Sequence, residues 1–272
     1  MTPSRDVPRC SVGAARQSLA GTAPYAQGWL LIASEGAWGA KAVEVLVGPA
    51  LRAWAEQRNI RILLVRRHDR TGDHQNQYWL SDSHGILLTG SLTDLNTPPS
   101  LDSTRLAEPM LVVCTNGSRD QCCAIEGVAL RKELQAMLTS AQLANLWEGT
   151  HIGGHRFAPT ALYLPQNLVY GRLTPTAAAG ILRDGLLEPE FLRGRSHYPP
   201  CFQVLEQHLK EFTAIEWEHS ASCPDIEHVH TGFLNDERLV FTVAPVANPL
   251  TVESCGKPAV SSTTWVVTNR SS

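Results

Sequence analysis

Two pairs of metal-ligating side chains stand out in this chain. Cys114 and Cys123 are separated by eight residues, and His151 and His155 enclose three residues in the segment His-Ile-Gly-Gly-His. Thiolates and imidazoles are soft or borderline ligands, so four of them delivered from two loops suit a metal site. Because glycine is a poor helix former, we expect the histidine pair to lie in a loop that can bend around a bulky ligand.

Two kinds of metal centre use such a donor set. A [2Fe-2S] cluster needs four protein ligands, and two neutral imidazoles in place of thiolates raise its reduction potential. If a ring nitrogen of each histidine reaches solvent, redox state and protonation are coupled, and the potential depends on pH in the neutral to alkaline range. A structural zinc site is the competing interpretation, although the gap between the cysteines is wider than in zinc fingers.

The remaining cysteines give a weaker signal. Seven cysteines in 272 residues is an odd number, and their spacing indicates no disulfide framework. We expect Cys10, Cys201 and Cys255 to be inert core residues. Cys122, next to Cys123, could replace it as a ligand. A thiol-disulfide oxidoreductase is a further alternative, but Cys-x-x-Cys is absent and the adjacent pair is a poor substitute.

Charged and polar residues near these ligands have two interpretations each. Arg119 and Arg156 flank the candidate ligands, so their charge could stabilise a reduced centre or a docked acidic partner. Both could also be ordinary solvated arginines, and Arg119 could form a loop-fixing salt bridge with Asp120. A later group matches no known ligand spacing and is interpreted as polar surface; it comprises His219, Cys223, His228 and His230.

The elements that must position the ligands follow a thioredoxin-like order. Both ligand pairs fall in loops that follow predicted strands, where a rigid sheet can present them. Thr174 is a helix N-cap signal, with Pro175 in the first turn. The predicted elements are a strand over 110–113, a helix over 124–138, a strand around Leu146, a hairpin over 161–164 and 168–173, and a helix from 174.

The first part of the chain repeats this plan. Strands are predicted over 29–33, 61–65, 77–80 and 85–88, a helix over 40–57 and a linker over 95–103; a helix over 202–212, a strand over 239–246 and a polar tail follow Pro199. We therefore predict an α/β protein with two thioredoxin-like halves and a small C-terminal appendage. Residues 1–104 form a half without a cluster that serves in docking or stabilisation, 105–198 a thioredoxin-like ferredoxin domain, and 199–272 the appended segment.

The chain resembles the sucrase/ferredoxin-like family. In that family an Arg-Asp pair lies between the two cysteines, and His-x-Gly-Gly-His-x-Phe follows; here these are Arg119-Asp120 and a segment that ends at Phe157. The resemblance implies a [2Fe-2S] cluster with Cys114 and Cys123 on one iron and His151 and His155 on the other. Asn116 departs from the family pattern, which often has histidine there. Weaker similarities are Gly21-Thr-Ala-Pro24, Trp38-Gly39, Ala158-Pro159 and Ser254-Cys255-Gly-Lys257.

Composition limits the classes of function. A net charge of -3 without massed lysine and arginine gives no footprint for nucleic acid or an anionic membrane. No run of about 20 apolar residues is present, and Met1 to Cys10 lacks a secretory signal, so a cytoplasmic location is expected. A glycosidase needs two facing carboxylates, and no segment suggests them. We expect an electron carrier that works with a reductase or acceptor protein, more than a substrate-converting enzyme.

Overall fold

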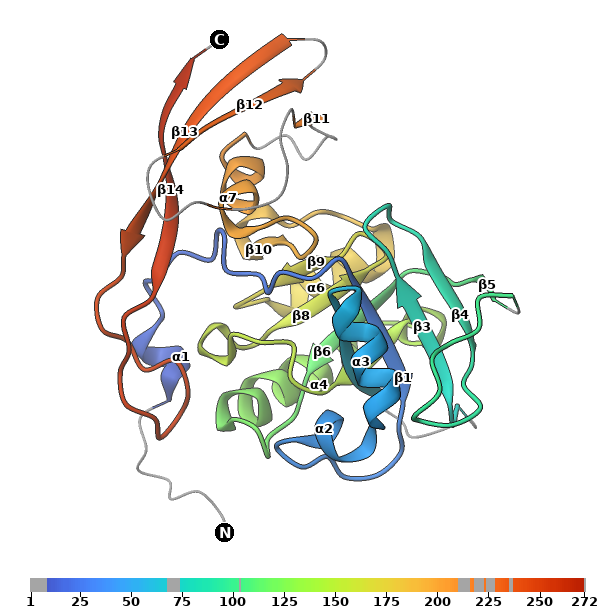
Figure 1. The fold of residues 1–272 in the computed structure, drawn as a ribbon. Coiled ribbons are helices and arrows are strands. Elements are labelled where there is room, and N and C mark those ends of the chain that lie inside the picture. Colours follow the sequence, from blue (N-terminus) through green and yellow to red (C-terminus); the bar gives the residue numbers. More distant parts are fainter. Residues whose placement is uncertain are drawn as a thin grey trace.

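The fold is built around one large mixed β-sheet (Figure 1). The computed structural model describes residues 9–67, 74–102, 104–209, 216–217, 223, 228–234 and 237–271. Ten strands lie in the sheet in the order β10-β9-β8-β6-β7-β2-β1-β3-β4-β5. They are β1 (Gly28–Ala33), β2 (Ile60–Arg67), β3 (Gln77–Ser81), β4 (Leu87–Ser91), β5 (Arg105–Leu106), β6 (Met110–Cys114), β7 (Leu146–Gly149), β8 (Ala161–Leu164), β9 (Leu168–Tyr170) and β10 (Leu192–Arg195).

The two halves of the chain enter this sheet with the same connectivity. Strand β1 pairs in parallel with β2 and antiparallel with β3, which continues into β4. Strand β6 pairs in parallel with β7 and antiparallel with β8, which continues into β9. A parallel neighbour requires a crossover, and helices supply it in both halves. The predicted α/β class, with its thioredoxin-like arrangement, is confirmed.

The halves meet where β2 and β7 pair antiparallel in the middle of the sheet. Strands on both sides of residue 104 therefore belong to one hydrogen-bonded unit. The domain boundaries at 104 and 198 stay predictions.

Helices cover one face of each half. Side chains alternate between the two faces of a strand, so Leu30 and Ile32 of β1 pack towards the first-half helices while Trp29 and Leu31 point the other way. Cys114 lies on the second face, in a core that both halves share. The helices are α1 (Cys10–Gly13), α2 (Ala42–Leu46), α3 (Pro49–Gln57), the π-turn η1 (Cys123–Gly127), α4 (Val128–Met137), α5 (Ser140–Leu143), the 3-10 turns η2 (His155–Phe157) and η3 (Pro189–Phe191), α6 (Pro175–Asp184) and α7 (Pro200–Leu209).

Several elements differ from their predicted form. The helix expected over 40–57 is divided into α2 and α3, because Gly48 is extended and Pro49 begins a new helix. The helix expected over 124–138 is η1 followed by α4. Thr174 caps α6 as predicted, accepting a hydrogen bond from the backbone of Ala177.

The prediction of a polar tail after residue 246 is wrong, because this segment contains the strand β14 (Thr263–Ser271). A second sheet has the order β11-β12-β13-β14, made of β11 (Glu216–Trp217), β12 (His228–Leu234), β13 (Glu237–Ala247) and β14 (Thr263–Ser271). Trp265 and Val267 of β14 pack against the core of α7. The more exposed Val266 lies between them, which is the alternation of a half-buried strand.

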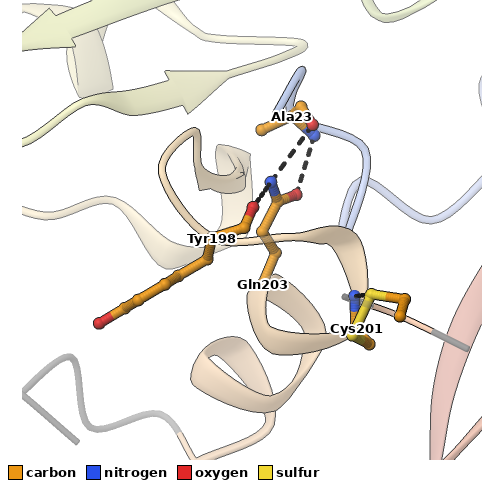
Figure 2. Close-up of a disulfide and its surroundings, with 5 residues drawn as sticks. Ala23, Tyr198, Cys201 and Gln203 are labelled. Carbon is orange, nitrogen blue, oxygen red and sulfur yellow. Dashed lines mark hydrogen bonds between the residues drawn. A yellow bond between two sulfur atoms is a disulfide. The ribbon is translucent and has the colours of Figure 1, made fainter. Parts of the chain in front are cut away.

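The expectation that Cys201 is an inert core thiol is also wrong, because Cys201 forms a disulfide with Cys223. Figure 2 shows Gln203 beside this disulfide, on the same helix. The Gln203 side chain accepts a hydrogen bond from the backbone N–H of Ala23 and donates to its carbonyl, 3.1 and 3.2 Å away. The start of the main sheet is thereby fixed to α7. His219 and the side chains of His228 and His230 lie outside the described residues.

Among the helices in the described part of the chain, none combines the length and the apolar character that crossing a bilayer requires.

Candidate metal centre

Sheet topology brings the two predicted ligand loops together. Strands β6 and β7 are parallel neighbours, and Cys114 at the end of β6 lies opposite Gly149 at the end of β7. Loops that leave the carboxyl ends of adjacent parallel strands emerge at the same edge of the sheet. One loop leads to Cys123 at the start of η1, and the other carries His151 and His155.

The two cysteines of the first loop are buried and in contact. The sulfurs of Cys114 and Cys123 lie 3.3 Å apart, and both side chains are almost fully excluded from solvent. The hydrogen bond with Cys123 holds the pKa of the Cys114 thiol well below its usual range. The His151 side chain and the backbone N–H groups of Ile152 and Asn116 also hydrogen-bond this sulfur and lower the pKa. Cys114 is therefore suited to carry negative charge.

The two histidines lie side by side in the second loop, with ring centroids 5.0 Å apart. Gly153 and Gly154 have φ angles of +113° and +69°, which a side chain would disfavour, and they make the turn between the rings. The loop conformation predicted for this segment is confirmed. The buried guanidinium of Arg193 donates to the Gly153 carbonyl at 2.7 Å and holds the turn in place.

The histidine nitrogens have different surroundings. Nδ1 of His155 lies 3.3 Å from a carboxylate oxygen of Asp120, which leaves Nε2 as the available ligand atom. Burial lowers the pKa of His155, against the opposing charge of Asp120. Nδ1 of His151 is buried, and no hydrogen-bond partner for it occurs among the described residues. A buried ring nitrogen without a partner fits a metal ligand better than a structural side chain.

The donor types of these four residues suit a metal centre. The sulfurs are close to the spacing of about 3.8 Å that two thiolates adopt on one tetrahedral metal. His151 joins the pair through its hydrogen bond to Cys114, and His155 lies beside His151. The contact of His155 with Asp120 is the outer hydrogen bond that orients ligating histidines in many metal sites.

The histidines face a pocket of about 540 Å³ with a basic rim. Arg119, Arg156 and Lys257 line it, and Arg156 forms an ion pair with Glu253 at 2.8 Å. Asp120 forms its ion pair with His155, so the salt bridge with Arg119, one of the interpretations open for Arg119, is not the pairing that the structure gives it. A second pocket, of about 290 Å³, lies between His151 and the first half of the chain; its first-half lining is Ala40, Ala42, Val43, Glu44, Arg61 and Ile62.

A second group of ligands lies next to His155, and the sequence did not predict it. Cys10, Asp120, Cys122 and Cys255 present ligand atoms within 4.8 Å of one another, an arrangement that could hold a metal ion. A hydrogen bond from Cys10 lowers the pKa of Cys122 to about 6, while that of Cys10 is raised.

Asp120 holds this second group together. Burial alone would raise the pKa of Asp120, but hydrogen bonds from the backbone N–H groups of Cys255 and Cys122 lower it overall. We expected Cys10 and Cys255 to be inert core thiols. The structure instead places both sulfurs in this group of ligand atoms. The weak family similarity of Ser254-Cys255-Gly-Lys257 was the one sequence signal that pointed to a role for Cys255.

A protein-family model described as sucrase/ferredoxin-like matches residues 19–194, which is more than half of the chain and includes the four predicted ligands. The chain belongs to the sucrase/ferredoxin-like family. A curated relative is "Altered inheritance of mitochondria protein 32" of Meyerozyma guilliermondii, 27% identical over 96 residues. That alignment covers 33% of this chain and 34% of the relative, so the chain spans about a third of the length of the protein that it matches. No solved structure matches this sucrase/ferredoxin-like chain.

Proposed function

We propose that this protein transfers single electrons by means of a [2Fe-2S] cluster held by Cys114, Cys123, His151 and His155. The observation that carries the proposal is the contact of two buried sulfurs, 3.3 Å apart, beside a buried imidazole nitrogen without a partner. When bound, the cluster supplies reversible uptake of one electron. Membership of a family described as ferredoxin-like supports the same function.

The surrounding residues favour a centre that is readily reduced. Backbone N–H groups of Ile152 and Asn116 donate to the Cys114 sulfur, and such donors stabilise added negative charge. Neutral imidazoles from His151 and His155 contribute no negative charge of their own. Both effects raise the reduction potential above that of an all-cysteine site.

Proton transfer is proposed to accompany electron transfer. His151 and His155 both line the larger pocket, where a ring nitrogen not used as a ligand can exchange a proton with solvent. The carboxylate of Asp120 at Nδ1 of His155 is a further site that can share this proton.

The basic rim of the same pocket supports a docking role. Arg119 and Lys257 line the pocket beside the histidines. An acidic surface on a reductase or acceptor protein would be attracted to these charges and guided to the ligands. Redox partner proteins therefore stay our proposed partners. The cytoplasmic location and the lack of nucleic-acid and membrane partners stay predictions from composition.

The alternative of a thiol-disulfide oxidoreductase is disfavoured by burial. The nucleophilic thiolate of such an enzyme must meet the disulfide of its substrate. Cys114 and Cys123 are both about 1% exposed, inside a core shared by the two halves. The remaining alternative is a zinc ion held by the same four ligands. A metal analysis must distinguish it from the [2Fe-2S] cluster.

Metal analysis of protein purified without oxygen tests the proposal. The wild-type chain should be red-brown and should contain iron and acid-labile sulfide in equal amounts. Cys114→Ser should lose most of both, because a hydroxyl is a poor ligand for iron. Cys201→Ser, which removes the distant disulfide, should retain them. Colourless protein whose zinc disappears in Cys114→Ser would contradict the proposal.

A further inference from the structure

We infer that Cys10, Asp120, Cys122 and Cys255 form a second metal centre, a structural site for one zinc ion. Three of these residues are cysteines that the proposed electron-transfer site does not use. The fourth, Asp120, contacts His155 with one carboxylate oxygen and approaches the sulfurs of Cys10 and Cys255 with the other.

The three sulfurs form a nearly equilateral triangle. Cys10 and Cys122 are 3.6 Å apart, Cys122 and Cys255 are 3.4 Å apart, and Cys255 and Cys10 are 3.5 Å apart. Zinc binds thiolate sulfur at about 2.3 Å, so two sulfurs on one tetrahedral zinc lie about 3.8 Å apart. The observed triangle needs to expand by only a few tenths of an ångström to fit one ion.

Asp120 supplies the fourth corner of the tetrahedron. Its Oδ1 lies 3.3 Å from the sulfur of Cys255 and 3.8 Å from that of Cys10. The backbone N–H of Cys122 donates to the same oxygen, and the backbone N–H of Cys255 donates to Oδ2, both at 2.9 Å. A carboxylate fixed by such outer hydrogen bonds is pre-oriented as a ligand.

The donor set and its compactness select zinc among the common metals. Calcium and magnesium prefer six or more oxygen ligands, and this group offers three sulfurs. A [2Fe-2S] cluster would place at least one of the three sulfurs on a different iron from the others, and a [4Fe-4S] cluster would place each sulfur on its own iron, so three sulfurs in mutual contact fit a single ion better. Three thiolates and one carboxylate fill all four positions of a tetrahedral ion, as in closed structural zinc sites.

Burial of negative charge also indicates a cation. The Asp120 side chain is 1% exposed and lies among three thiols, where an uncompensated carboxylate would be costly. The ion pair that the structure gives it is with His155, which the proposed function assigns to the other centre. A bound divalent ion would compensate Asp120 and the thiolates together.

The site would connect three distant parts of the chain. Cys10 begins α1, Cys122 precedes η1, and Cys255 lies in a turn between β13 and β14. Figure 1 shows α1 beside the loop of the C-terminal segment, and the hydrogen bond from Gln17 to Thr251 joins the same segments. One ion would fasten both segments next to His155, whose Nδ1 contacts Asp120.

Zinc and iron contents of single variants test the inference. We expect one zinc per wild-type chain, purified without chelator. Cys10→Ser, Cys122→Ser and Cys255→Ser should each lose most of the zinc, because serine is a poor zinc ligand. Cys114→Ser should keep its zinc, and this holds whether or not the wild-type chain contains iron. Failure of the electron-transfer proposal is therefore distinguishable from failure of the zinc site.

Two measurements on the wild-type chain avoid variants that fail to fold. Zinc K-edge absorption should give three sulfurs and one oxygen or nitrogen neighbour. Alkylation without reductant should label three more cysteines after treatment with a zinc chelator than before it. Wild-type protein without zinc, zinc that all three variants retain, or cysteines that stay blocked after chelation because they form a disulfide, would each overturn the inference.

Discussion

His151 and His155 have the same side chain, but their positions give them different capacities for proton exchange. Nδ1 of His155 is held by Asp120, whereas Nδ1 of His151 has no partner among the residues that the structure describes. Because Nδ1 has no partner, the hydrogen bond of His151 to the Cys114 sulfur comes from Nε2, and the nitrogen that does not bind the metal can hold a proton beside the pocket that both histidines line. His151 is then the main site of proton exchange.

We predict that His151→Cys removes most of the pH dependence of the reduction potential. Reduction adds negative charge and raises the pKa of a ligating histidine, so the reduced state binds the proton more tightly. The wild-type potential should fall as pH rises, by up to about 59 mV per pH unit between the two pKa values, for one electron and one proton. Potentiometric titration at a series of pH values measures this slope.

Exposed His84 provides the matched control for this substitution. His84→Cys should leave the slope unchanged, because the imidazole that it removes lies outside the site. An unchanged slope in both His151→Cys and His155→Cys would remove the histidines from the coordination sphere.

At the scale of residues, sequence spacing could show which of two adjacent cysteines is a candidate ligand. It could not show which cysteines far apart in the sequence lie together in the fold. The eight-residue gap selected Cys123, and its sulfur is the one that contacts Cys114. Cys122 faces the opposite way, towards Cys10 and Cys255. Residues 112 and 133 positions away have no periodic relation to Cys122, so only the folded chain could bring them together.

The elements around the site depend on close packing between η1 and β6. Gly127 ends η1, and a Cβ atom at this position would lie 2.1 Å from the backbone oxygen of Cys114. The helix can therefore approach the strand only because residue 127 has no side chain. A π-turn at this place, where Cys123 begins the helix, is typical of functional sites.

We predict that Gly127→Ala destabilises the fold by about 1–3 kcal/mol, the usual cost of overpacking a core. It should also lower the iron content, because η1 must shift and carry Cys123 away from Cys114. Denaturant unfolding and metal analysis of the same preparation measure both effects.

Gly180→Ala in α6 is the control, since its Cβ meets only ordinary contacts at 3.5 Å. In this helix alanine should stabilise the protein by up to about 1 kcal/mol. Equal stability of the Gly127→Ala and Gly180→Ala proteins would show that η1 tolerates a side chain against β6.

Sequence periodicity predicted most elements of the second half because strand and cap signals there are local. Thr174 and Pro175 fixed the start of α6 within one residue. The break between α2 and α3 was missed, since apolar spacing continues across Gly48 and Pro49. Strand β14 was missed because six of its nine residues are polar, and its pairing with β13 is a long-range contact.

On the scale of the whole molecule, a buried ionic network joins the two halves next to the site. Glu148 of β7 pairs with Arg66 of β2 at 2.9 Å and with Arg131 of α4 at 3.1 Å. The Thr115 hydroxyl, next to Cys114, donates to the same carboxylate at 3.1 Å. No sequence pattern indicated this network, because its members come from both sides of residue 104.

We predict that Glu148→Gln lowers the free energy of unfolding by about 3 kcal/mol. The substitution removes one partner and leaves two largely buried guanidinium groups without compensation. Chemical denaturation of the purified chain measures the change.

Asp184→Asn in the exposed pair with Arg183 is the control, and it should change the stability by less than about 1 kcal/mol. Similar stabilities of the two variants would mean that solvent screens the Glu148 network.

The antiparallel pairing of β2 with β7 has a consequence for each half taken alone. Each half has the strand plan of a complete small domain, yet each uses the other to cover one border of its sheet. Without its neighbour, either half would have an exposed edge strand with unpaired backbone N–H and C=O groups. Such an edge can pair with another copy of the chain. Because β2 and β7 cover each other, the intact chain leaves neither of these strand edges open.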